Sequence, residues 1–280
     1  MPLVLVFALW TPAMIAASYI WQYGDYYDYG WVVPPAAILL SIRRWRDDRF
    51  PLIPLGRRAL LIGAALLFPW ILLLRILNHT DPSWRLPIGT LGFTAAICGH
   101  VLIGMTRGWR FSAGYLWITL LWLSALPWFF AVEKGLIHHL TQGVIAAAAE
   151  LFQLFGTPVE VVGDQLILHD ITVEVTDGCS GVRSFQSFVM ASWFFTELYR
   201  LSLTRALVLL ICSCVVAFLV NMARTYALAH IRFEHGKEAF DNAHDWLGLL
   251  AFLVSGVLFF LISGRLAAFS RRVVLRTVKP

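Results

Sequence analysis

Three short segments of this chain carry side chains suited to covalent catalysis. Residues 177–184 read Asp-Gly-Cys-Ser-Gly-Val-Arg-Ser and place Cys179 just before an apolar stretch. The second segment ends at Arg224, and the third begins at His244. A thiol, a guanidinium and an imidazole are the groups that a cysteine-dependent acyl-transfer enzyme uses. The elements that carry these segments must therefore bring the three groups together.

Cys179 precedes an apolar helix that the sequence predicts to begin near Gly181. The dipole and the unpaired N–H groups at the start of that helix favour a thiolate, and Arg183, four residues on, adds positive charge. Gly178 and Gly181, on either side of the Cys179-Ser180 pair, allow a backbone or a substrate to approach closely. The alternative is a buried, inert thiol, which is the commoner fate of an unpaired cysteine. The position and the polar neighbours favour the reactive thiol.

Arg224 and His244 lie at the ends of two further predicted spans. Asn221 lies three residues before Arg224 on the same helical face. The guanidinium could stabilise the oxyanion of a tetrahedral intermediate or hold the substrate backbone, or it could merely extend toward the membrane surface. The imidazole of His244 could take the thiol proton and later donate one to a leaving amine, or it could be an ordinary interfacial histidine. Gly248, one turn after His244, permits close helix packing.

A metal site is a competing interpretation of the histidines near the third segment. His230 and His235, with Asp241 and Asp245, have the right ligand types, but their spacing matches no tight helical ligand pair. We therefore predict neither a metal nor any other cofactor. The net charge of +5 is best explained by orientation in a membrane, so we predict no nucleic-acid partner.

Composition indicates the class of fold. Of the 280 residues, 59% are hydrophobic and 14% are charged, and the mean hydropathy is +0.72. Repeated apolar runs of transmembrane length predict an all-α polytopic membrane protein with about eight transmembrane helices. The N-terminal run lacks the basic region of a cleaved signal peptide and is predicted to be a retained span. The predicted spans lie near residues 3–21, 29–44, 59–77, 87–106, 112–132, 181–199, 206–224 and 244–264.

Basic residues predict the orientation of these spans. Most of the 22 Lys and Arg lie in one set of connections and in the C-terminal tail. By the positive-inside rule these parts face the cytoplasm, together with both termini. The other connections carry most of the acids and are predicted to be extracytoplasmic; they are residues 22–28, 78–86, 133–180 and 225–243. All three reactive segments then open on the same outer face.

Two elements are predicted between the fifth and the sixth span. Residues 136–155 cannot cross the membrane if the charge bias is to hold, so we predict a helix in the outer interface. Valines alternate with acids in residues 157–176 around a turn signal at Gly163, which predicts a short extracytoplasmic β-hairpin. Such a hairpin could pair with an extended peptide by strand addition. The chain thus divides into a five-helix membrane region, residues 1–132, and a catalytic region, residues 133–280.

The second half of the chain resembles the exosortase/archaeosortase family of multipass membrane cysteine enzymes. The likeness covers roughly residues 135–263 and only the outline of the N-terminal half. The matching features are the hairpin-like run before the cysteine and, in order, Cys179-Ser180-Gly181, Arg183-Ser184, Asn221, Arg224, His244 and Gly248. The resemblance implies that Cys179, Arg224 and His244 are catalytic, and that Ser180, Gly181, Arg183 and Asn221 support them or contact substrate. His244 in the third position is similar to the bacterial branch, which implies the cell inner membrane.

The resemblance also implies a substrate and a reaction. Family members process exported proteins with a C-terminal sorting signal, which consists of a short motif (Pro-Glu-Pro in many bacterial substrates), a transmembrane helix and a basic tail. The expected reaction is peptidase or transpeptidase chemistry through a cysteine-linked acyl intermediate, which water, an amine or a lipid resolves. Three other classes compete: a transporter or export partner for polysaccharide or lipid, a scaffold that only binds sorting-signal helices, and a membrane acyltransferase with another donor.

Overall fold

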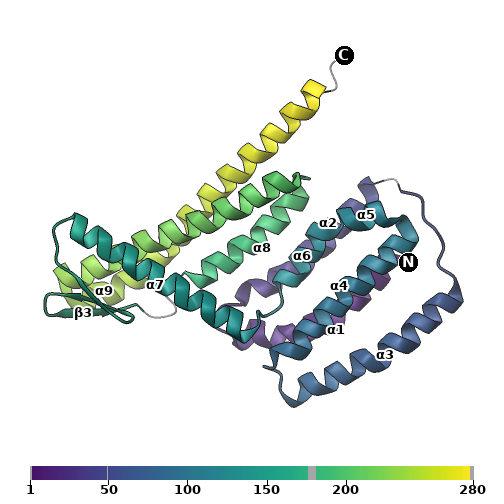
Figure 1. Cartoon of the computed structure of the whole chain (residues 1–280), viewed down its shortest axis with the longest axis horizontal. Helices are drawn as coiled ribbons and strands as arrows, with labels where there is room; N and C mark the ends of the chain where they lie inside the picture. Colours follow the sequence, from purple (N-terminus) through teal and green to yellow (C-terminus); the bar gives the residue numbers. More distant parts are fainter. Residues whose placement is uncertain (1, 49, 176–180, 278–280) are drawn as a thin grey trace. The chain divides into compact units, whose positions relative to one another are not determined.

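The computed structural model describes residues 2–48, 50–175 and 181–277 of the chain, and its side chains as far as residue 268. These residues are mostly helical, with one small β-sheet (Figure 1). The chain divides into two compact units, each described here by itself. The first unit comprises residues 1–130 and 193–200, and the second comprises residues 131–192 and 201–280.

The first unit is a bundle of helices. α1 packs along α4, and α3 and α5 also contact α4. The interior combines stacked aromatic rings with paired polar groups, such as Trp10 on Trp122, with ring centroids 5.3 Å apart, and the Trp21 Nε1–H that donates to the carbonyl of Ala125 at 2.6 Å. The elements are α1 (Pro2–Tyr23), the 3₁₀ helix η1 (Asp28–Val32), α2 (Val33–Asp47), α3 (Arg57–Thr80), α4 (Arg85–Arg107), α5 (Trp109–Gly114) and α6 (Leu116–Ser124).

An ion cluster joins α2 to the end of α8 (Val182–Leu198) inside the first unit. Glu197, only 2% exposed, accepts a hydrogen bond from Arg44 Nη1 at 2.6 Å. Arg200 pairs with Asp48 at 3.2 Å, and Arg43 Nη1 donates to the carbonyl of Leu198 at 2.9 Å. These charge-assisted contacts satisfy buried charges and attach the α8 end to α2.

The second unit contains α7 (Phe130–Leu154), the sheet, most of α8, and α9 (Leu203–Thr277). Within α9 the backbone leaves helical geometry at Gly236, where φ is 80° and ψ is −170°, values that glycine adopts without steric cost. Gly236 divides α9 into a first arm, residues 203–235, and a second arm, residues 237–277. The two arms lie beside each other, since side chains of both line one groove. They run in opposite directions (Figure 1).

The sheet is an antiparallel meander of β1 (Glu160–Val162), β2 (Gln165–Leu168) and β3 (Ile171–Glu174). Its turns have positive φ at Gly163 (61°) and His169 (55°). Its inner face meets α7 and α9 in a small apolar core, here called the sheet core, formed by Ile145, Ala148, Ala149, Phe152, Leu166, Leu168, Val173, Val175 and Ala229. Gln142 Nε2 also donates to Asp164 Oδ1 at 2.6 Å, which holds the first turn against α7.

The helical membrane class is confirmed, whereas the number of spans is not. Among the described residues, four helical segments are long and apolar enough to cross a bilayer, namely Pro2–Tyr23, Arg57–Thr80, Arg85–Arg107 and Leu203–Ala268. The last contains both arms of α9. α2 and α8 have 15 and 17 residues, which is short for a span of about 20 residues.

Three predicted elements differ in detail from the structure. The predicted fifth span, residues 112–132, is broken into α5 and α6, and α6 ends at Ser124 before Pro127, because proline disfavours helical geometry in the residue before it. The predicted connection 225–243 contains the reversal between the two arms of α9, at Gly236, and its other residues are helical, since they include many good helix formers. The predicted hairpin has a third strand, because residues 165–168 pair on both sides. A helix over residues 136–155 is present as α7.

Candidate active site

The start of α8 lies against the first arm of α9. Gly181 has φ of +80°, and a Cβ atom built on it would lie 2.8 Å from Cγ and 2.9 Å from Nδ2 of Asn221. Only glycine fits this position, because both the backbone conformation and the close approach exclude a side chain. The Gly181 carbonyl accepts the N–H of Phe185 at 2.9 Å and so takes part in the first turn of α8. Asn221 is 7% exposed, so this contact is well packed.

Arg224 and His244 form a hydrogen bond between the two arms. Arg224 Nη2 lies 3.3 Å from His244 Nε2. A guanidinium can only donate, so Nε2 of a neutral imidazole is the acceptor and Nδ1 carries the hydrogen. His244 Nδ1 lies 3.0 Å from Asp245 Oδ1, and the carboxylate accepts that hydrogen. The contacts thus arrange Asp245, His244 and Arg224 in a chain, with Nε2 of the histidine toward the guanidinium.

Gly248 makes room for the guanidinium of Arg224. A Cβ atom on Gly248 would lie 3.5 Å from Arg224 Nη2 and 3.7 Å from Cζ, so the guanidinium lies directly over this glycine. Arg224 Nε is buried and has no hydrogen-bond partner within the described parts of the chain. A buried donor without a partner is costly, and this N–H is well suited to donate a hydrogen bond to a carbonyl oxygen that arrives with a substrate.

The sheet core borders the same place on α9. The ring centroids of Phe240 and His244 are 6.1 Å apart. Val175, directly after β3, and Phe240 line a small space together with Thr225, which follows Arg224. The buried Thr225 hydroxyl has no hydrogen-bond partner among the residues that the structure describes. β3 therefore ends next to the turn of the first arm that carries Arg224.

The segment that contains Cys179 and Ser180 lies outside the described residues, as do Asp177 and Gly178. The chain on both of its sides is described. Val175 is placed near Thr225, and Gly181 contacts Asn221. Residues 221, 224 and 225 share one helical face, because they are three and four positions apart. The described ends of the cysteine segment therefore lie on either side of Arg224.

The remaining predicted site residues lie as follows. The structure brings Gly181 to Asn221, and Arg224 to His244 and Gly248. Arg183, the second residue of α8, is exposed, and its carbonyl accepts the hydroxyl of Ser187 at 2.8 Å.

Two polar groups of the second unit were not predicted from the sequence. Asp245 was considered only as a metal ligand, although its position beside His244 offered a hint of its contact. Gln186 on α8 is 1% exposed, and neither its amide oxygen nor its amide nitrogen has a partner in the described part of the chain. An amide inside a predicted membrane span is the signal that could have identified it.

Comparison with known proteins identifies the family. Residues 21–261 match the family described as Transmembrane exosortase (Exosortase_EpsH), which covers most of the chain. No curated protein and no solved structure matches the chain. The chain belongs to the transmembrane exosortase family.

Proposed function

We propose that this exosortase-family chain is a membrane cysteine peptidase or transpeptidase that cleaves C-terminal sorting signals of exported proteins. Its catalytic residues are Cys179, Arg224 and His244. The observation that carries the proposal is that the described ends of the cysteine segment, at Val175 and Gly181, lie beside the helical turn of Arg224. Arg224 in turn lies within hydrogen-bond distance of His244.

The proposed reaction begins when Nε2 of His244 accepts the thiol proton of Cys179. The thiolate attacks the scissile carbonyl carbon, and the guanidinium of Arg224 stabilises the negative charge that develops on the carbonyl oxygen. The C–N bond then breaks, and the leaving amine takes a proton from the imidazolium. The product is a thioester on Cys179, and the transmembrane helix of the signal leaves with the amine.

A second nucleophile completes the cycle. Water, an acceptor amine or a lipid hydroxyl gives its proton to His244 and attacks the thioester carbonyl, which releases the exported protein from the sulfur. Asp245 accepts the Nδ1–H of His244 throughout, and so orients Nε2 toward the reacting atoms.

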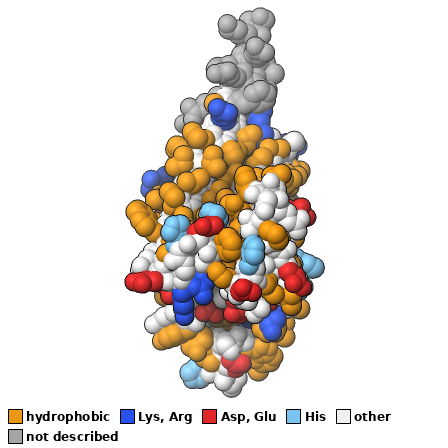
Figure 2. Space-filling view, turned by 90° about the vertical axis from the view of Figure 1, so that its left-hand side faces the viewer, with side chains coloured by type: hydrophobic (Ala, Val, Ile, Leu, Met, Phe, Trp, Pro, Cys, Tyr) orange, Lys and Arg blue, Asp and Glu red, His pale blue; other side chains and the backbone are white. Residues whose placement is uncertain are grey.

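We place this site on the extracytoplasmic side of the inner membrane, with both termini in the cytoplasm. The support is the charge bias of the sequence, whose basic residues gather in the opposite connections and in the C-terminal tail. Figure 2 shows acidic, basic and histidine side chains together in the middle and lower part of the face that it presents, below a largely hydrophobic region. A signal helix with a basic cytoplasmic tail would have the orientation of the second arm of α9, so its motif would emerge near Cys179.

The experiment that tests the proposal follows cleavage of an exported reporter. The reporter carries a Pro-Glu-Pro motif, a transmembrane helix and a basic tail at its C-terminus, and is co-expressed with the full-length chain. We expect Cys179→Ala to abolish cleavage, and Cys214→Ala, a matched change in the first arm of α9, to retain it. Both variants should melt in detergent at the wild-type temperature. Mass spectrometry of the wild-type protein should detect the reporter peptide as an acyl group on Cys179. Undiminished cleavage by Cys179→Ala would refute the proposal.

A further inference from the structure

An apolar groove runs between the two arms of α9 and reaches the candidate active site. It encloses about 360 Å³. We call it the interarm groove, and it is lined by Leu219, Val220, Ala223, Arg224, Ala227, Leu247, Leu250, Ala251 and Val254. We propose that this groove holds the outer end of the transmembrane helix of the sorting signal during cleavage. This inference rests on the proposed function and adds the place where the substrate binds.

The groove and the candidate active site share a residue. Among the described residues that line the groove, Arg224 is the only charged one, and its Nη2 lies 3.3 Å from His244 Nε2. A helix in the groove would therefore place the peptide at its outer end beside the guanidinium and the imidazole. The remaining lining is aliphatic, so it matches an apolar helix and offers nothing to a polar ligand.

The walls of the groove are shaped for close approach of a helix. Ala223 and Ala227 are four residues apart, so they share one face of the first arm, and Ala251 lies on the facing wall. Small side chains let helix backbones approach closely in a membrane, where dispersion contacts rather than the hydrophobic effect hold helices together. Leu219 and Leu250 are 49% and 51% exposed, so they are accessible for contact along the incoming helix.

The length of the groove limits what it can bind. From Leu247 to Val254 the second arm rises about 10 Å, and from Leu219 to Ala227 the first arm rises about 12 Å. That is about two helical turns, well short of the ~30 Å of a bilayer core. The groove would therefore hold the turns of the signal helix nearest the scissile bond, and leave the rest among lipid. Binding only this end fixes the reacting peptide without retaining the released helix along its whole length.

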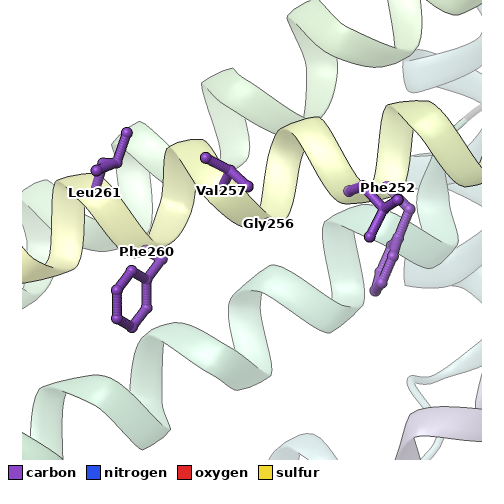
Figure 3. A pocket seen from close by; sticks show the side chains of 6 residues that line it. Phe252, Gly256, Val257, Phe260 and Leu261 are labelled. Atoms are coloured by element: carbon purple, nitrogen blue, oxygen red, sulfur yellow. The ribbon is translucent and has the colours of Figure 1, made fainter.

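A second hollow on the same arm provides a matched control surface. It lies over Gly256 and is lined by Phe252, Leu253, Val257, Phe260 and Leu261, all of one helix. Figure 3 shows Phe252 and Phe260 projecting on one side of the helix with Gly256 between them. This hollow encloses about 310 Å³, a size similar to that of the groove, but it has no charged residue and no wall from the first arm. It is therefore apolar in the same way, yet disconnected from Arg224.

Site-specific photo-crosslinking tests the proposal. Benzoylphenylalanine replaces either Ala251, in the groove, or Val257, in the control hollow, of the full-length Cys179→Ala protein, which retains uncleaved reporter. The reporter is the one with a Pro-Glu-Pro motif, a transmembrane helix and a basic tail. After illumination of membranes, we expect at least about tenfold more adduct with the reporter helix from position 251 than from position 257. Equal yields from both positions, or adducts with phospholipid alone from position 251, would overturn the proposal.

Cleavage by bulky variants provides the second measurement. In the chain that retains Cys179, Ala251→Trp should lower the cleavage rate at least about tenfold, whereas Val257→Trp should leave it within about twofold. Ala223→Leu repeats the test on the opposite wall in case the tryptophan prevents folding. In all variants that cleave poorly, a maleimide should still alkylate Cys179. Such alkylation would show that the cysteine remains accessible and reactive. Cleavage at the wild-type rate by both Ala251→Trp and Ala223→Leu would refute the groove assignment. Loss of reporter cleavage in Cys179→Ala would in that case still support the proposed function.

Discussion

Replacing Gly181 by alanine should destabilise the junction between α8 and the first arm of α9. Gly181 has φ of +80°, and an L-residue in left-handed geometry costs about 1–2 kcal/mol. The added Cβ would also lie 2.8 Å from Cγ of Asn221, which is far inside van der Waals contact. Overpacking of this kind costs about 1–3 kcal/mol. Together the two contributions predict a loss of about 2–5 kcal/mol in the free energy of unfolding.

The same substitution should reduce cleavage beyond its effect on stability. Relief of the overlap requires the start of α8 to move away from Asn221, and the chain just before it carries Cys179. A displacement of about 1 Å in a reacting group can cost about a hundredfold in rate. We therefore expect cleavage of the sorting-signal reporter to fall at least about tenfold at a temperature where the variant is still folded.

A double-mutant cycle separates the two causes. Asn221→Ala removes Cγ and Nδ2, the nearest atoms, but leaves the unfavourable φ of residue 181 unchanged. In that background Gly181→Ala should cost about 1–3 kcal/mol less than in the wild type, measured from unfolding in detergent. Gly256→Ala is the matched control, because nothing lies within 4 Å of its Cβ position and its helix tolerates alanine. Additive effects of the two substitutions at 181 and 221 would show that the side chain of Asn221 does not restrict residue 181.

Substitutions at three further positions test other contacts. Gly248→Ala should retain cleavage, since its Cβ would make an ordinary 3.5 Å contact with Arg224, whereas Gly248→Leu should displace the guanidinium and lower the rate about a hundredfold in the reporter assay. Asp245→Asn weakens the acceptor for the histidine Nδ1–H and should lower cleavage by about two- to fivefold with unchanged melting, because Asp245 is fully exposed. Glu197→Ala leaves the largely buried Arg44 without its 2.6 Å partner and should cost about 3–5 kcal/mol in unfolding, while Glu197→Gln should cost less.

The sheet shows how far a sequence pattern can predict local structure. Alternating valines and acids, with a glycine at the turn, predicted strands over residues 157–176, and the antiparallel pairs confirm them. The second turn was not predicted, because it depends on His169 with φ of 55°. Left-handed geometry is uncommon for a histidine, and here ring stacking on Phe233 in the first arm of α9 accompanies it. That partner is more than sixty residues away, so no local signal could indicate the turn.

Helix ends were harder to predict than helix interiors for the same reason. The predicted span over 112–132 is broken at Tyr115, whose hydroxyl is hydrogen-bonded to Ser41 of α2. Hydropathy describes the apolar character of the span and not this polar contact with another helix. In α9 the polar stretch after Arg224 contains the reversal at Gly236, but the first arm stays helical as far as residue 235, because Ala229 lies in the sheet core and Tyr226 and Phe233 pack against it. Tertiary packing there outweighs the polarity on which the boundary was predicted.

In the candidate site, too, some features were predicted from the sequence and others depend on tertiary contacts. Residue type and position at the ends of predicted spans suggested Arg224 and His244, and the structure places these two side chains within hydrogen-bond distance of each other. What the sequence could not predict is how these groups approach one another. That approach depends on two glycines, since Gly181 lets α8 contact Asn221 and Gly248 leaves the space in which the guanidinium lies. A glycine has no side chain to suggest a partner, so its role emerges only when the opposing helix is in place. Substitutions at these two glycines therefore test the geometry of the site more directly than removal of the reactive groups themselves, which would abolish cleavage in any arrangement of the helices.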